Sequence, residues 1–262
     1  MINVTIWNEN VHEQDTGKIG DIMRGIYPDG IHGYLKKALA ADDLFIRTAT
    51  LDMPEQGLPD DVLNTTDVLL WWGHAAHAKV DDALVDRIQE RVRGGMGLIV
   101  LHSGHMSKIF RRMMGTSCCL LWREVAEKER VWCIDPSHPI AKGIPSSFVI
   151  PHTEMYGERI DIPQDGHIVF MSWYEGGNVF RSGVAFQRDM GRIFYFAPGH
   201  ETFPIYHEEY VQKVIANAIR WAAPVCEIAV RKCTNEVEPT EKVYSENPLA
   251  NIDTSSLHKA VE

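Results

Sequence analysis

The sequence predicts an α/β fold: a doubly wound, mostly parallel sheet flanked by helices, with antiparallel strands added in the second half. Three observations predict it. Short apolar runs alternate with amphipathic stretches as far as Gly115, an order typical of parallel sheets covered by helices. Several of these runs are apolar throughout, as expected for strands buried on both faces. From Trp122 to Phe196, β-rich segments instead follow one another with only turns between them.

The apolar runs of the first half predict its strands. Each run is rich in branched or aromatic residues and ends where polar or glycine residues begin. The predicted strands are residues 3–7, 45–51, 67–72 and 96–101.

Helical spacing of apolar residues predicts a helix after each of these strands, and after the first strand a long loop comes before the helix. Gly94-Gly95 and Gly115 end two of the helices. The loop, residues 9–33, is polar and glycine-rich, and a loop of that length is usually functional or partly structured. The predicted helices are residues 31–41, 60–63, 81–92 and 105–114.

The second half is predicted to hold extended segments and one strong helix. Residues 122–135 and 148–162 are interpreted as short strands or irregular extended pieces. Strands are predicted at 167–175, 179–188 and 192–196. The helix at 206–223 is amphipathic and ends at Pro224.

Length and composition indicate one domain and a tail. The chain has 262 residues, is 45% hydrophobic and 24% charged, and so has the profile of a globular protein. We predict a domain over residues 1–224 and an extended C-terminal tail over 225–262. The tail is polar, so we expect it to lie across its own domain or over a neighbouring subunit of a homo-oligomer.

Charge and motifs exclude several classes of protein. The net charge of −10 argues against nucleic acid as a partner. Neither a membrane-spanning run nor a signal peptide is present, and the five cysteines form no C-x-x-C pair, so we expect a cytoplasmic protein with reduced thiols and no membrane partner. No G-x-G-x-x-G follows the first strand and no P-loop occurs, so no nucleotide cofactor is expected.

Histidines follow the apolar runs repeatedly. His74 follows the run at 67–72, His102 and His105 follow 96–101, and His200 follows 192–196. The carboxyl ends of parallel strands share one edge of the sheet, where open α/β sheets bind ligands. We therefore predict one pocket with several imidazoles and at least two carboxylates, suited to proton transfer or to a metal ion.

We assign the catalytic role to His102 and His200 together with three carboxylates. Glu9 ends the first strand, and Glu154 shares a side of an extended segment with His152 if the residues alternate. Glu201 is expected to orient His200. The alternatives are buried histidines that hold loops and, for Glu154, a surface ion pair.

Other residues are assigned to substrate or metal. His74, His32, His105 and Trp173 are predicted to contact a carbohydrate substrate. His102, His200 and His74 are predicted to bind a divalent metal, with zinc preferred because imidazole ligands suit it.

Several motifs carry a resemblance to a known family. The strand-to-helix turn at His102-Ser103-Gly104 has the form of a nucleophile elbow. In their order along the chain, the segments resemble the ThuA-like family, named for trehalose utilisation, and the class I glutamine amidotransferase fold. The matching segments are Trp7-Asn8-Glu9, Tyr27-Pro28-Asp29-Gly30-Ile31-His32, Trp71-Trp72-Gly73-His74, Leu101-His102-Ser103-Gly104-His105, Glu154-Met155-Tyr156-Gly157-Glu158 and Pro198-Gly199-His200-Glu201, within residues 3–223.

One departure from the fold's pattern limits the function. His102 stands where an amidotransferase carries its nucleophilic cysteine, and imidazole cannot form the thioester of glutamine hydrolysis. The resemblance implies carbohydrate utilisation, so we expect acid–base chemistry on a sugar, such as isomerisation, epimerisation or hydrolysis, assisted by a metal. The alternatives are a non-catalytic sugar-binding or regulatory protein and an assembly protein that acts through its tail.

Overall fold

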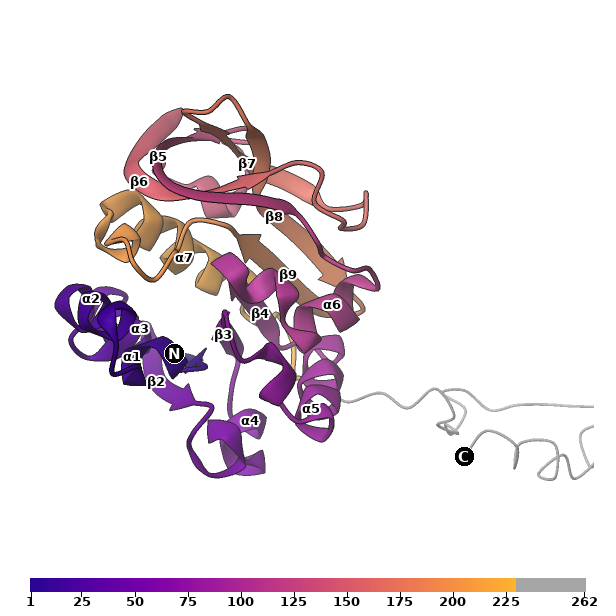
Figure 1. The fold of residues 1–262 in the computed structure, drawn as a ribbon. Helices are drawn as coiled ribbons and strands as arrows, with labels where there is room; N and C mark the ends of the chain where they lie inside the picture. The colour runs from indigo at the N-terminus through magenta and orange to yellow at the C-terminus, as the bar shows by residue number, and fades with distance from the viewer. Residues whose placement is uncertain (230–262) are drawn as a thin grey trace, which may run out of the picture.

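The computed structural model describes residues 1–229 of the chain and is built on one nine-stranded sheet. The strand order is β2-β1-β3-β4-β9-β8-β7-β5-β6, so the early strands lie at one end of the sheet and β5 to β7 at the other (Figure 1). The parallel strands are β1 (Ile2–Asn8), β2 (Leu44–Thr50), β3 (Val68–Trp72), β4 (Gly97–Leu101) and β9 (Gly191–Phe196).

The second half of the sheet is antiparallel, as predicted. Its strands are longer than the short or irregular pieces expected between residues 122 and 162. They are β5 (Leu121–Cys133), β6 (Ser147–Gly157), β7 (His167–Tyr174) and β8 (Val179–Arg188). The predicted doubly wound, mixed α/β fold is therefore confirmed.

Helices cover both faces of the parallel strands. On one face, α3 (Gly30–Ala38) and α7 (Glu209–Ala222) bury apolar residues against Val4, Leu70 and Ile99. On the other face, α4 (Asp60–Asn64), α5 (Asp82–Arg93) and α6 (Lys108–Met114) pack on Leu69 and Leu98. Burial on both faces explains why β3 and β4 are apolar throughout.

The predicted long first loop contains two helices, α1 (Val11–Gln14) and α2 (Lys18–Ile26). The chain leaves β1 for β2 on one side and returns to β3 on the other. Ligands of open α/β sheets bind outside the strand ends at such a reversal. The loop therefore borders the place where a site is expected.

The strand register brings the functional loops to one edge. Asn8 pairs with Trp72, Trp72 with Leu101, and Leu101 with Phe196. Because these four residues end β1, β3, β4 and β9, the loops that follow all begin at the same level. This alignment brings together the histidines that follow these strands.

The described residues include only the first part of the predicted tail. Ile228 packs against the core, and the backbone N–H of Ala229 donates to the Gly94 carbonyl at 3.2 Å. The contact expected for the rest of the 225–262 tail lies outside the described residues, which end at 229. Within residues 1–229, no helix is long and apolar enough to cross a membrane.

Helix α6 starts at Lys108, three residues later than predicted, because Ser107 caps it. The Ser107 hydroxyl accepts a hydrogen bond from the Phe110 N–H at 3.2 Å. We expect Ser107→Ala to lower the free energy of unfolding by about 1 kcal/mol, the typical cost of losing such a cap. Denaturant unfolding measures this, with Ser107→Thr as the control that keeps a hydroxyl. Equal unfolding midpoints for Ser107→Ala and the wild type would contradict it.

Candidate functional site

The turn after β4 holds His102 in an unusual backbone conformation. Its φ is +48°, in the left-handed region that residues other than glycine rarely adopt. The segment His102–Met106 forms one turn of 3₁₀ helix before α6 begins. A strained residue between a strand and a helix is the geometry of the predicted elbow, and such strain gathers at functional sites.

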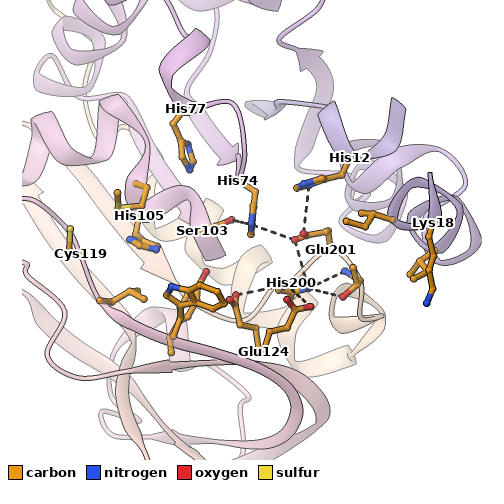
Figure 2. Close-up of a pocket in the computed structure, with 18 residues that line it drawn as sticks. His12, Lys18, His74, His77, Ser103, His105, Cys119, Glu124, His200 and Glu201 are labelled. Atoms are coloured by element: carbon orange, nitrogen blue, oxygen red, sulfur yellow. Dashed lines mark hydrogen bonds and ion pairs between the residues drawn. The ribbon is translucent and has the colours of Figure 1, made fainter. Parts of the chain in front are cut away.

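A cavity of about 790 Å³ opens at the carboxyl ends of the parallel strands. That volume is in the range of small-molecule sites. Figure 2 shows the side chains of His12, His74 and His200 gathered around Glu201, with Lys18 and Cys119 toward opposite ends. The wall also contains His77, Ser103, His105, Trp122, Glu124, Glu154 and Tyr156.

His102 lies behind this wall and is 1% exposed. Its Nδ1 is 2.8 Å from the Ala197 carbonyl oxygen, so Nδ1 carries the proton and donates. Nε2 is then a lone-pair acceptor, which the Tyr156 hydroxyl reaches at 3.2 Å. Burial, with His74 nearby, lowers the pKa of His102 to about 3, so the ring is neutral at pH 7.

Glu154 is a buried carboxylate between two imidazoles. Its Oε2 lies 3.2 Å from Nε2 of His102 and 3.9 Å from Nε2 of His200. This oxygen has no hydrogen-bond partner among the described residues. Nε2 of His102 carries no hydrogen. The contact between this nitrogen and Oε2 of Glu154 is therefore favourable only when a proton or a cation lies beside the two atoms. Burial accordingly raises the pKa of Glu154.

His200 has the opposite tautomer to His102. The Thr202 backbone N–H donates to Nδ1 of His200 at 3.1 Å, so the neutral ring keeps its proton on Nε2. Nε2 also lies 3.7 Å from Glu124 Oε1. Burial and then the neighbouring His102 lower the pKa of His200 to about 3. His200 is therefore a neutral N–H donor at the cavity wall.

Glu201 is the second buried carboxylate, surrounded by three imidazoles. Its oxygens lie 3.7 Å from Nδ1 of His12, 3.5 Å from Nδ1 of His74 and 3.8 Å from Nδ1 of His200. Burial raises the pKa of Glu201 to about 7, while His12 acts in the opposite direction. The site thus contains two carboxylates that hold protons more readily than usual.

The structure brings most of the predicted residues together. The rings of His102 and His200 are 5.3 Å apart between centroids, in an edge-to-face arrangement. His74 and His105 line the cavity with His200, Glu154 and Glu201. His200 lines the cavity directly. His102 does not line it, but it contacts Tyr156 and Glu154, which do. The catalytic and binding roles of these residues stay predictions.

Besides His102, three predicted residues do not line the cavity. Glu9 accepts the backbone N–H groups of Ala75 and Ala76 at 2.6 and 2.9 Å, and so holds the loop that carries His74. Nδ1 of His32 accepts a hydrogen bond from the Asn8 side chain at 3.0 Å. Trp173 is 37% exposed on β7 and is not part of the cavity wall. Glu9 is therefore placed to position a loop rather than to touch a substrate.

Other wall residues were not selected from the sequence. His12 follows β1 just as His74 follows β3, so the pattern of histidines after strands could have found it. Tyr156 lies in one of the segments that resemble the ThuA-like family, and its hydroxyl oxygen is 3.2 Å from Nε2 of His102. Trp122 and Glu124 lie near the start of β5, and only the tertiary fold turns them toward the cavity.

Comparison with known proteins agrees with this architecture. A family model described as trehalose utilisation (ThuA) matches residues 3–222. Among solved structures, a ThuA-like protein of Bacteroides uniformis is 16% identical, with a TM-score of 0.61, 84% of this chain covered and 91% of the other. A ThuA-like protein of Parabacteroides merdae is 13% identical, with a TM-score of 0.59 and coverages of 87% and 92%. A Salmonella typhimurium protein titled as cytoplasmic is 14% identical, with a TM-score of 0.54 and coverages of 84% and 99%. No curated protein matches the chain.

Proposed function

This chain belongs to the ThuA family, described as trehalose utilisation, and from that premise we propose that it is an enzyme that transfers protons on a sugar or oxidised sugar. Glu154 carries the reaction in this proposal, and His200 assists it. One observation supports this most directly. The unpartnered Oε2 of a buried carboxylate lies 3.9 Å from the nitrogen of a neutral N–H donor, at the wall of a cavity large enough for a sugar.

The arrangement suits removal of a proton from a carbon beside a carbonyl. The Glu154 carboxylate takes the proton, the electron pair of the C–H bond forms a carbon–carbon double bond, and the π electrons of the carbonyl move to its oxygen. The Nε2–H of His200 donates a hydrogen bond to that oxygen as its charge develops. A carboxylate base with a neutral imidazole as the donor is a known solution for this chemistry.

Return of the proton decides the product. Protonation of the same carbon from the other face, by a second acid on that face, gives the epimer. Return to the neighbouring carbon, with transfer of the hydroxyl proton between the two oxygens, moves the carbonyl by one position. Hydrolysis of a glycosidic bond has no carbonyl oxygen for a neutral N–H donor to stabilise, so isomerisation or epimerisation is the better fit. The elbow residue His102 lacks the thiol that glutamine hydrolysis uses.

Deuterium exchange tests this proposal without knowledge of the product. The wild-type protein is incubated in D₂O with ketohexoses and with glycosides oxidised to ketones at C2, C3 or C4. We expect NMR to show deuterium on the carbon beside the carbonyl of at least one compound, faster than without protein. Binding of these compounds without any exchange would instead support the non-catalytic sugar-binding alternative.

A further inference from the structure

We propose that His74, His102 and Glu201 form a binding site for a divalent transition metal, with zinc as the best-suited ion. The site adjoins the proposed reaction centre, but metal binding can be measured whether or not the proposed reaction occurs. One ligand atom from each of the three residues lies within 4.8 Å of the other two. Tetrahedral zinc, with bonds of about 2.0–2.2 Å, separates its ligand atoms by roughly 3.3–3.6 Å, so small side-chain movements close the site.

The hydrogen bonds of the two imidazoles prepare them for a metal. His102 donates its Nδ1 proton to the Ala197 carbonyl oxygen. The Ser103 hydroxyl donates to the Gly73 carbonyl at 2.9 Å, so it accepts from Nδ1 of His74, 3.0 Å away. In each ring, one nitrogen is thereby fixed to a protein oxygen and the other keeps its lone pair. This is how proteins orient metal-binding imidazoles.

The carboxylate has an unsatisfied oxygen at the same place. Glu201 is 4% exposed, and its Oε2 has no hydrogen-bond partner among residues 1–229. The neighbouring Nδ1 of His12 is also buried and unpartnered in that part of the chain. A buried polar atom without a partner costs free energy, and far more when it is charged. A cation bound by Glu201 removes that cost.

A second group of possible ligands, His102, Glu154 and His200, satisfies the same distance limit. It fits less well because Nδ1 of His200 accepts the Thr202 N–H, which leaves the proton on Nε2. Glu201 therefore replaces His200 in the ligand set expected from the sequence. The Tyr156 hydroxyl, which occupies Nε2 of His102, has the Glu154 carboxylate as another acceptor and can turn to it.

The ligand chemistry indicates the class of metal. Two imidazoles and one carboxylate favour zinc and similar transition metals over calcium or magnesium. Three protein ligands leave a coordination position open, as in catalytic rather than structural zinc sites. His74 and Glu201 both line the cavity, so the open position is accessible to vicinal oxygens of a sugar bound there.

Metal content and affinity test the site. The full-length wild type is purified without chelator and analysed for metals, and the metal-free protein is then titrated with Co²⁺ and with Zn²⁺. We expect about one equivalent of metal and visible absorption from tetrahedral Co²⁺. Both His74→Gln and Glu201→Gln should weaken binding at least tenfold. His105→Gln, which removes an imidazole of the same wall outside the group, should leave the affinity unchanged.

Several outcomes would overturn the inference. The inference is wrong if the wild type binds neither Co²⁺ nor Zn²⁺ at micromolar concentration. Equal affinity in wild type, His74→Gln and Glu201→Gln places the metal elsewhere and has the same consequence. Near-ultraviolet circular dichroism shows which variants are folded, and half-exposed His74 is the safer substitution. Deuterium exchange by a protein without metal affinity would reject the metal site and leave the proposed function intact, whereas metal binding without exchange would do the reverse.

Discussion

Replacing Glu154 by glutamine should slow turnover by about 10²–10⁴-fold, the range over which a positioned acid–base group contributes. The amide has nearly the same shape, so substrate binding should change little. Proton transfer is lost because an amide neither accepts nor returns the proton. The deuterium exchange rate measures this effect, with the wild type and the variant compared at saturating substrate.

His152→Gln is the matched control for this prediction. His152 lies on the same strand two residues away, but it is exposed and contacts the Ala126 carbonyl. Its substitution should leave the exchange rate within about twofold, the scale expected of exposed positions away from special features. An unchanged rate in Glu154→Gln would remove Glu154 from the mechanism, and the proposed proton transfer would then need another carboxylate.

Glu129→Gln should stabilise the protein at neutral and higher pH. Glu129 lies on β5 and is 1% exposed, and Ser172 and Tyr174 of β7 donate to its Oε1 at 2.5 and 3.3 Å. Burial raises its pKa from 4.5 to about 7, while those two hydrogen bonds act against the shift. The folded protein therefore keeps the proton over a pH range in which the unfolded chain has already lost it.

The sign of the pH effect follows from this difference. Below pH 4.5 both states hold the proton and Glu129 contributes no penalty. As the pH rises from about 4.5 to 7, the unfolded state ionises first, so the free energy of unfolding falls. A shift of about 2.5 pKa units corresponds to roughly 3 kcal/mol once the pH exceeds 7. Glutamine can accept the same two hydrogen bonds and does not ionise, so the variant should not show this loss.

Urea unfolding at pH 5 and pH 8 measures the difference. We expect Glu129→Gln to exceed the wild type by about 3 kcal/mol more at pH 8 than at pH 5. Glu90→Gln, on the exposed side of α5, is the control for loss of one surface charge. If the advantage of Glu129→Gln is the same at both pH values, the buried carboxyl is ionised in the folded state and the prediction is wrong.

The positions of His152 and Glu154 show where a prediction from neighbouring residues alone is wrong. Alternation along an extended segment placed His152 and Glu154 on one side. The pairing of β5 with β6 shifts register between Glu127–Thr153 and Glu129–Ile150. His152 is exposed, whereas Glu154 is buried in the cavity wall. A bulge depends on the partner strand, so a pattern within one strand cannot reveal it.

By itself, the sequence determined the mixed sheet and its covering helices and, through matching motifs, the family. It also predicted that His74, His102, His200, Glu154 and Glu201 meet. Local spacing is sufficient for the sheet, the helices and the histidines at strand ends, because apolar period and strand-end position are properties of neighbouring residues. Only the tertiary structure decided that Glu9 binds loop amides, that His102 lies behind the wall, and which nitrogen of each ring holds the proton. These outcomes depend on hydrogen-bond partners from distant segments, such as Ala197 for His102, and no local pattern encodes them.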